Sequence, residues 1–269
     1  ISEPPDIGPA LGPASGGMRP IAELMYRDFA FVAADQIFNQ VAKTRYVFGG
    51  HAKIPLVIRG QQGTGRGNAA THSQSLESLF MHIPGLKVVC PSTPADAAGL
   101  LRTAIRDDNP VCFFEHKVLY ATKGEVPDDP DFCIPFGKAD IKREGTDVTI
   151  VANLLYVERA LEAADELAKE GISAEVIDPR TLVPFDYDTV AESVKKTGRL
   201  VVVHEAHQNN GWGAQVVSQV GQMVFPYLDA APVHIGAKAC PLPFNLGLEQ
   251  VVLPSVKDIV DACKVSLYR

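Results

Sequence analysis

The sequence has no long hydrophobic run and no cysteine pattern suited to cross-links or metal binding. No apolar stretch approaches the about 20 residues that a membrane-spanning helix needs, and no signal peptide of the basic-then-apolar kind opens the chain. The five cysteines are odd in number, scattered and never in a C-x-x-C pair, which excludes a disulfide framework and a zinc site of that kind. Because Cys90 and Cys112 lie in apolar segments, we expect buried thiols in a reducing compartment.

The sequence also lacks a surplus of basic residues. It has 25 Lys and Arg against 32 Asp and Glu, for a formal net charge of −7. Nucleic-acid binding needs a clustered basic face, so this balance argues against a nucleic-acid partner. The 46% hydrophobic content is typical of a globular protein, and 269 residues are a natural length for two domains.

The common signatures of nucleotide and hydrolase sites are missing. There is no G-x-G-x-x-G at a strand–helix junction, no P-loop, no H-E-x-x-H and no G-x-S-x-G. Residues 60–67 are dense in glycine and could cradle a phosphate, but such loops are common and the signal is weak.

Hydrophobic patterning indicates alternating strands and helices. Five prolines within residues 1–20 predict a loop or disorder there. A helix is expected over 28–46, ending at a pair of glycines, and another over 94–106, capped by Ser92 or Thr93. Helices are also expected over 158–170, 188–197 and 212–225, and strands over 54–58, 86–90, 111–115, 148–152, 174–177 and 200–204.

This order predicts an α/β protein of two domains, each a mostly parallel sheet flanked by helices. The segment 124–131 is acidic and rich in proline, so we expect a linker over 124–136. The domains would then span residues 1–123 and 137–269.

Several stretches resemble one enzyme family in the same order along the chain. They are ISE at 1–3, RPIAELM at 19–25, DQI at 35–37, AK at 42–43, THSQ at 71–74, PGLKVV at 84–89, AIRDDNP at 104–110, GTDVTIV at 145–151, VIDPRTL at 176–182 and KTGRLVVVHE at 196–205. The sequence is similar to the beta subunit of the thiamine-diphosphate-dependent decarboxylase component of 2-oxo acid dehydrogenase complexes. These complexes include the pyruvate, branched-chain 2-oxo acid and acetoin enzymes, of the transketolase-like superfamily.

The resemblance implies a thiamine pyrimidine-binding domain followed by a transketolase C-terminal domain. It implies an alpha-two beta-two heterotetramer that passes its acyl product to a lipoyl acyltransferase core component. The cofactor's diphosphate and its magnesium would belong to the alpha subunit, whose Gly-Asp-Gly…Asn motif this chain lacks. Bacterial cytoplasm is the expected location, with the mitochondrial matrix as an alternative.

The family's site residues map onto four positions here. Glu3 stands at the glutamate that activates thiamine, a role that needs a protonated carboxyl in an apolar pocket. Phe29 matches an aromatic residue that packs on the aminopyrimidine ring, and Met25, about one turn away, could line the same pocket. His72 matches a histidine that acts in acyl transfer to the lipoyl group. As alternatives, Glu3 would be a solvated terminal residue and Phe29 an ordinary core residue.

A possible potassium site follows from the resemblance to pyruvate-specific members. Backbone carbonyl groups at a helix end suit a hard cation. The matching positions are Leu56, Ala104, Ile105, Asp107 and Asn109.

The function expected from these features is oxidative decarboxylation of a branched-chain 2-oxo acid or pyruvate, with acyl transfer to a lipoyl domain. An acetoin dehydrogenase beta subunit is an alternative. Another is a non-catalytic assembly subunit, favoured by prolines where the family has a helix after Glu3. A single-chain transketolase is disfavoured because the diphosphate motif is missing. Of the other histidines, His204 ends an apolar strand; a position at a subunit face is one alternative, and a surface or capping role is the expected one.

Overall fold

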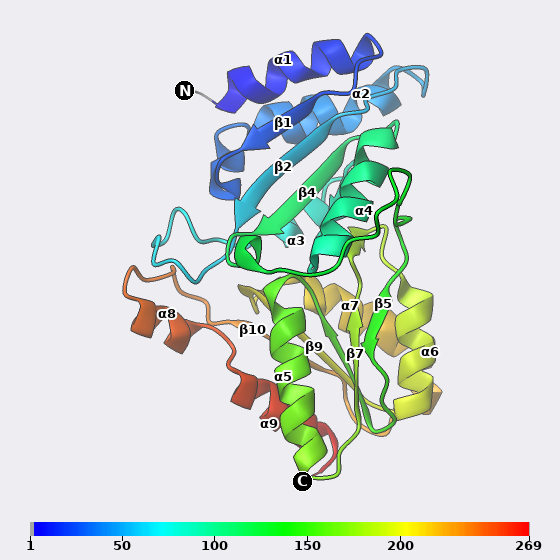
Figure 1. Cartoon of the computed structure of the whole chain (residues 1–269), viewed down its shortest axis with the longest axis vertical. Coiled ribbons are helices and arrows are strands. Elements are labelled where there is room, and N and C mark those ends of the chain that lie inside the picture. The colour runs from blue at the N-terminus through cyan, green and yellow to red at the C-terminus, as the bar shows by residue number, and fades with distance from the viewer. Residues whose placement is uncertain (1–2, 269) are drawn as a thin grey trace.

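The computed structural model describes residues 3–268, with side chains from residue 7 onward. Two α/β halves, each built on one sheet, are stacked along the long axis of the molecule (Figure 1). The N-terminal half forms the upper part and the C-terminal half the lower part. The predicted fold class, two mostly parallel sheets flanked by helices, is confirmed. No helix in the part of the chain that the structure describes is long and apolar enough to cross a membrane.

The first sheet has the strand order β1-β2-β4-β3-β8. Its first four strands are parallel, and β8 pairs antiparallel with β3 at the edge. Because β8 comes from the second half of the chain, the two halves share one sheet. The strands are β1 (Ile21–Leu24), β2 (Val57–Gln62), β3 (Lys87–Val89), β4 (Val111–His116) and β8 (Thr181–Val183).

The second sheet has the order β10-β9-β6-β7-β5, with only β5 antiparallel. Its central strands are buried on both faces, as their continuous apolar runs predicted. The strands are β5 (Asp140–Arg143), β6 (Val148–Ala152), β7 (Ala174–Asp178), β9 (Leu200–His207) and β10 (Val233–Ala237).

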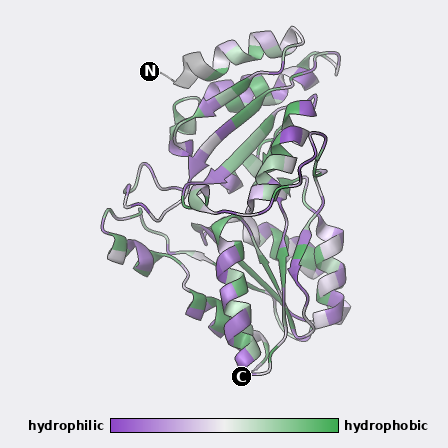
Figure 2. Ribbon diagram, viewed as in Figure 1, coloured by the Kyte–Doolittle hydropathy of each residue, from purple (hydrophilic) through white to green (hydrophobic). Residues whose placement is uncertain are grey.

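Helices cover both sheets, and their apolar faces turn inward (Figure 2). On the second sheet, α5 packs with α9 on one face and α6 with α7 on the other. The helices are α1 (Glu3–Ser15), α2 (Ala42–Val47), α3 (Glu77–Met81), α4 (Pro94–Arg106), α5 (Leu155–Lys169), α6 (Tyr187–Thr197), α7 (Trp212–Val224), α8 (Leu246–Val252) and α9 (Val256–Ser266), with short helices η1 (Arg27–Phe31), η2 (Gln36–Val41), η3 (Leu119–Ala121) and η4 (Phe225–Tyr227).

The loop predicted for residues 1–20 is wrong, because Glu3–Ser15 forms α1 despite Pro9 and Pro13 inside it. Tertiary packing explains the helix: Ile7 and Ala14 are buried, and α1 lies against η2 and β1. The burial of this apolar face offsets the hydrogen bonds that the prolines cannot donate. The family helix after Glu3 is therefore present here.

The single helix predicted for 28–46 is also wrong in detail. The structure divides this stretch into the 3₁₀ helix η1, the π-helix η2 and the α-helix α2. Gly49 and Gly50, both with positive φ, end it as expected. The helix over 94–106 matches α4, and Thr93 caps it by accepting a hydrogen bond from the Asp96 amide.

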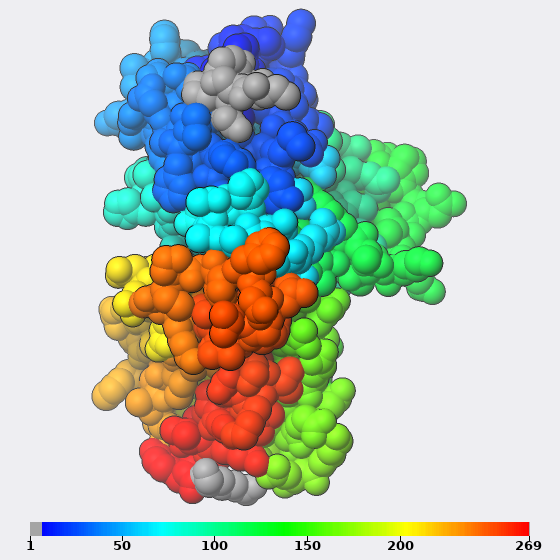
Figure 3. All heavy atoms as spheres, turned by 90° about the vertical axis from the view of Figure 1, so that its left-hand side faces the viewer, coloured from blue at the N-terminus to red at the C-terminus, as the bar shows by residue number. Residues whose placement is uncertain are grey.

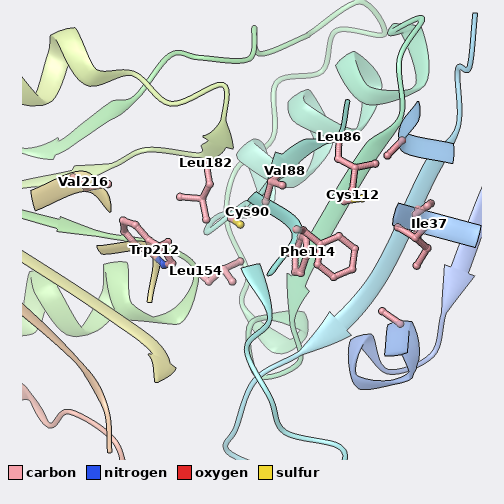
Figure 4. Close-up of a cluster of buried hydrophobic side chains, with 14 of the residues drawn as sticks. Ile37, Leu86, Val88, Cys90, Cys112, Phe114, Leu154, Leu182, Trp212 and Val216 are labelled. Carbon is pink, nitrogen blue, oxygen red and sulfur yellow. The ribbon is translucent and has the colours of Figure 1, made fainter. Parts of the chain in front are cut away.

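One hydrophobic core extends through both halves of the molecule. It joins Phe114 and Cys112 of the first sheet to Leu182, Leu154 and Trp212 from the second half (Figure 4). The side chain of Trp212 is 1% exposed. All five cysteines are free, and Cys90 and Cys112 are buried as predicted.

Candidate active site

Two neighbouring parallel strands end at the same edge of the first sheet and bring the candidate site residues there. Met25 and the helix η1, which carries Phe29, follow β1. The loop of residues 63–75, called here the glycine loop, follows β2 and carries His72. Since β1 and β2 pair in parallel, their carboxyl ends lie side by side, and so do these segments.

Two aromatic rings contact the imidazole of His72. The ring centroids of His72 and Phe29 lie 5.1 Å apart with an interplanar angle of 81°, and those of His72 and Tyr26 lie 4.9 Å apart at 78°. Such edge-to-face packing fixes the plane of the imidazole. The Nδ1 atom of His72 also lies 3.0 Å from the hydroxyl of Thr71. The structure therefore brings Phe29 and His72 together and adds Tyr26, which sequence reasoning missed.

The surface beside this cluster is open and apolar. The side chain of Met25 is 70% exposed, that of Phe31 is 53% exposed, and Phe29 is half-buried. Exposed apolar side chains next to a partly buried aromatic ring suit a flat heteroaromatic ligand. Glu3 opens α1, but its side chain lies outside the described residues.

Carboxylates of the second half hold the start of the glycine loop. The Thr64 amide donates to Oε1 of Glu205 over 2.6 Å, and the Gly65 amide donates to Glu249. Figure 3 shows the loop, in cyan, lying against the segment that contains α8, in orange. Because carboxylates already occupy these two amides, they are not available to a phosphate, and the phosphate-cradle interpretation of residues 60–67 is not supported.

A buried histidine–carboxylate pair lies directly under the glycine loop. The Nε2 atom of His116 is 2.7 Å from Oε2 of Glu205, and both side chains are almost fully buried. Burial alone would raise the pKa of Glu205, but the charge and hydrogen bonds of His116 and Thr64 hold that pKa below its ordinary value. Gly63 (φ +90°) must be glycine here, because a Cβ atom would come within 2.3 Å of His116.

Comparisons with known proteins identify the family. The family models "Transketolase, pyrimidine binding domain" and "Transketolase, C-terminal domain" match residues 1–123 and 137–259. The beta subunit of acetoin:2,6-dichlorophenolindophenol oxidoreductase from Cupriavidus necator is 54% identical over 99% of this chain and 79% of its own length. The pyruvate dehydrogenase E1 component subunit beta from Rhizobium meliloti is 47% identical over 100% of this chain and 58% of its own length.

The chain belongs to the E1 beta-subunit family of the transketolase-like superfamily. A mitochondrial rice member, pyruvate dehydrogenase E1 component subunit beta-2, is 43% identical over 100% of this chain and 72% of its own length. Among solved structures, a split-gene transketolase described as an inactive beta4 tetramer superposes with a TM-score of 0.82. That structure is 27% identical and is matched over 100% of this chain and 82% of its own.

Membership of the E1 beta family implies thiamine diphosphate as the cofactor. The described residues fit its aminopyrimidine half, because Met25 and Phe31 are exposed apolar side chains and Phe29, between them in sequence, packs against His72. They do not offer the amides of Thr64 and Gly65 to its diphosphate half, since Glu205 and Glu249 bind these two amides.

Four of the five carbonyl groups expected to bind potassium in this E1 beta chain already have hydrogen-bond donors. Arg19 Nη1 donates to the carbonyl oxygens of Ile105 and Asp107, each over 2.9 Å, so these two oxygens converge on one point.

The other expected ligands have partners elsewhere. The carbonyls of Leu56 and Ala104 accept from the amides of Val111 and Asp107. The amide and side chain of Asn109 donate to Oδ1 of Asp107, and the Asn109 side chain accepts from Arg45. A guanidinium, itself a cation, thus lies against two of the five expected ligands.

The surface or capping role expected for His204 is wrong. His204 is fully buried on β9, 2.7 Å from Nε2 of His234 and beside the ring of Trp212. Burial lowers the pKa of His204 to about 3, so the imidazole is neutral near pH 7. His204 is part of the core of this E1 beta chain and lies outside the His72 cluster.

Sequence reasoning missed three further groups around the glycine loop: Lys117, His116 and Glu205. His116 is the last residue of β4, Lys117 directly follows it, and Glu205 lies near the end of β9. A polar residue that directly follows an apolar strand is the signal that could have marked them, because strand ends of parallel sheets are where sites form.

Proposed function

We propose that this chain is the beta subunit of a thiamine-diphosphate-dependent 2-oxo acid dehydrogenase and is active only with an alpha subunit. The reaction is oxidative decarboxylation of a 2-oxo acid with transfer of the acyl group to a lipoyl domain. The observation that carries this proposal is the packing of His72 against Phe29 and Tyr26 at an open apolar surface, in a chain of this family.

The bound cofactor supplies the electron sink that decarboxylation of a 2-oxo acid needs. Phe29, with Met25 at its side, orients the aminopyrimidine ring and keeps water from one face of it. The carboxyl group of Glu3 holds a proton at N1′ of that ring. His72 moves a proton during acyl transfer, because an imidazole ring can both accept and donate a proton.

We further propose that an alpha-two beta-two assembly provides what this chain lacks. The alpha subunit holds the diphosphate and its magnesium, which fits the binding of the Thr64 and Gly65 amides by Glu205 and Glu249. The split-gene transketolase tetramer of beta chains alone is described as inactive, which supports a need for the partner chain. The acyltransferase core component is the second partner, and potassium at Leu56, Ala104, Ile105, Asp107 and Asn109 is an additional proposal.

The substrate is proposed to be pyruvate or a branched-chain 2-oxo acid, in the cytoplasm of a bacterium or in a mitochondrial matrix. An acetoin dehydrogenase is the second candidate, because the Cupriavidus necator relative that is 54% identical bears that name. Pyruvate, branched-chain 2-oxo acids and acetoin, tested in turn on the reconstituted complex with 2,6-dichlorophenolindophenol as electron acceptor, would separate these candidates.

Calorimetric titration with thiamine diphosphate and magnesium tests the shared site. We expect binding by the mixture of this chain with its alpha subunit and none by this chain alone. The Glu3→Gln variant should assemble normally but lose activity. A complex that forms but neither binds the cofactor nor changes with Glu3→Gln would instead support a non-catalytic assembly subunit.

A further inference from the structure

Lys117 is a buried cation that the chemistry described above does not use. It directly follows β4, and its side chain is 0% exposed. Among the described residues, no carboxylate oxygen lies within ion-pair distance of its ammonium group. Removing an ammonium group from water without a partner charge costs several kcal/mol, so its burial here needs compensating contacts.

Those contacts are made almost entirely with the glycine loop. The Nζ atom of Lys117 donates to the backbone carbonyl of His72 over 2.6 Å and to Oδ1 of Asn68 over 3.2 Å. It also lies 5.3 Å from the ring centroid of Tyr26, the same ring that packs against His72. One ammonium group therefore contacts both the backbone of His72 and an aromatic ring that fixes its imidazole.

The backbone of Lys117 is itself held by the first sheet. Its amide donates to the carbonyl of Gln62 at the end of β2, and its carbonyl accepts from Arg66 over 2.6 Å. Asp28 binds the loop at a second point, because its Oδ1 atom accepts hydrogen bonds from the amide and the side chain of Gln74. Lys117 is thus the link between the rigid strand end and the part of the loop that carries His72.

We propose that Lys117 is a positioning residue that places His72 for acyl transfer to the lipoyl group. This inference rests on the function proposed for His72. The hydrogen bond from the ammonium group fixes the His72 carbonyl relative to the end of β4, while Tyr26 and Phe29 fix the plane of the imidazole. Without this hydrogen bond the loop keeps its contacts with Glu205 and Asp28, but the segment between them, residues 66–73, becomes more mobile.

The test uses the alpha–beta complex carrying Lys117→Met, which keeps the length of the side chain and removes its donors. We expect acylation of a free lipoyl domain to slow by about 10- to 100-fold, the range for a misplaced catalytic group. Decarboxylation coupled to 2,6-dichlorophenolindophenol should stay within about twofold, because it needs no transfer to the lipoyl group. In a His72→Ala background, Lys117→Met should have little further effect on acylation, since both changes act on one step.

Limited digestion with trypsin gives a readout independent of activity. Cleavage after Arg66, followed by mass spectrometry, should be faster in Lys117→Met than in the parent complex. Lys264→Met is the matched control: it removes a partly buried ammonium group that pairs with Glu170, far from the loop. It should change neither acylation nor cleavage after Arg66.

The outcomes separate this inference from the function it rests on. If His72→Ala leaves acylation unchanged, the role proposed for His72 fails, and with it the inference. If His72→Ala slows acylation while Lys117→Met changes neither acylation nor cleavage after Arg66, only the inference is overturned. Should Lys117→Met fail to fold, Lys117→Arg replaces it: this variant keeps the charge but shifts the donors, and a selective loss of acylation is again expected.

Discussion

His116 and Glu205 face each other across the boundary between the two halves of the chain, with Nε2 and Oε2 2.7 Å apart. His116 ends β4 in the first sheet, and Glu205 lies on β9 in the second. The other carboxylate oxygen of Glu205 accepts from the Thr64 amide of the glycine loop. One buried carboxylate thus connects the second sheet to the first sheet and to the loop that carries His72.

Glu205→Ala should strongly destabilise the protein. The substitution leaves the buried donors of Thr64 and His116 without an acceptor, a change that costs about 3–5 kcal/mol for a broken buried pair. Urea unfolding at neutral pH measures the loss. The exposed pair of Glu166 and Lys169 provides the control, since Glu166→Ala should cost less than about 1 kcal/mol. Equal losses in the two variants would contradict a structural role for the buried pair.

Asp178 should make the protein less stable as the pH rises from about 4 to 6. Burial, with Asp96 nearby, raises the pKa of Asp178 to about 6 against the opposing effect of Lys142. Between the unfolded pKa of about 3.9 and this folded value, the folded state binds more protons, so the free energy of unfolding falls with increasing pH.

Asp178→Asn removes this titration. Between pH 4 and pH 7, the free energy of unfolding of the variant should rise relative to that of the parent by about 2 kcal/mol, because most of the pKa shift lies within this range. Urea unfolding of both proteins at a series of pH values measures the difference. Parallel pH profiles would show that Asp178 is ionised in the folded state throughout this range.

Trp212 should report the unfolding of both halves at once. It is the only tryptophan, and it is buried in a core that also contains Phe114 and Cys112 of the first sheet. We expect the urea transitions followed by tryptophan fluorescence and by far-UV circular dichroism to coincide. A fluorescence transition that precedes the loss of secondary structure would mean that the halves separate before they unfold.

The proposed potassium site predicts that the thermal stability of the protein depends on which cation the salt supplies. The midpoint of thermal unfolding should be higher in potassium chloride than in choline chloride at equal ionic strength, because a ligand that binds only the folded state stabilises it. Arg19→Met should enlarge this difference, since it frees the carbonyls of Ile105 and Asp107 for the ion.

Arg102→Met is the matched control for this measurement, because Arg102 also bridges two carbonyl groups, those of Asp129 and Phe132, at another place. Its dependence on potassium should equal that of the parent protein. Identical midpoints in the two salts for all three proteins would mean that the Arg19 guanidinium alone serves these carbonyls.

Local sequence signals predicted the second half of the chain well. The strand over 148–152 and the helix closed by Gly198, whose φ is +70°, match the structure because each is encoded within a few residues. Near the N-terminus the same local rules failed. The prolines of α1 predicted a loop, but packing of Ile7 against the first domain outweighed their cost.

The candidate site likewise contains residues that the sequence indicated and residues that it did not. The family resemblance marked Phe29 and His72 separately as site residues, and the parallel pairing of β1 with β2 explains why their rings meet. Tyr26 and Lys117 were missed, because no spacing pattern marks a side chain whose partner lies on a different segment. The distance of 45 positions between Lys117 and His72 is closed only when β2 and β4 pair.

By itself, the sequence determined the alternation of buried strands and amphipathic helices, the family of the chain and two members of the aromatic cluster. These features depend on residues that are close together or on motifs in a constant order. Only the tertiary structure decided that β8 completes the first sheet, that Glu205 binds the glycine loop and that Lys117 contacts His72. Such contacts join strand ends far apart in the sequence, and their geometry exists only once the two sheets have packed against each other.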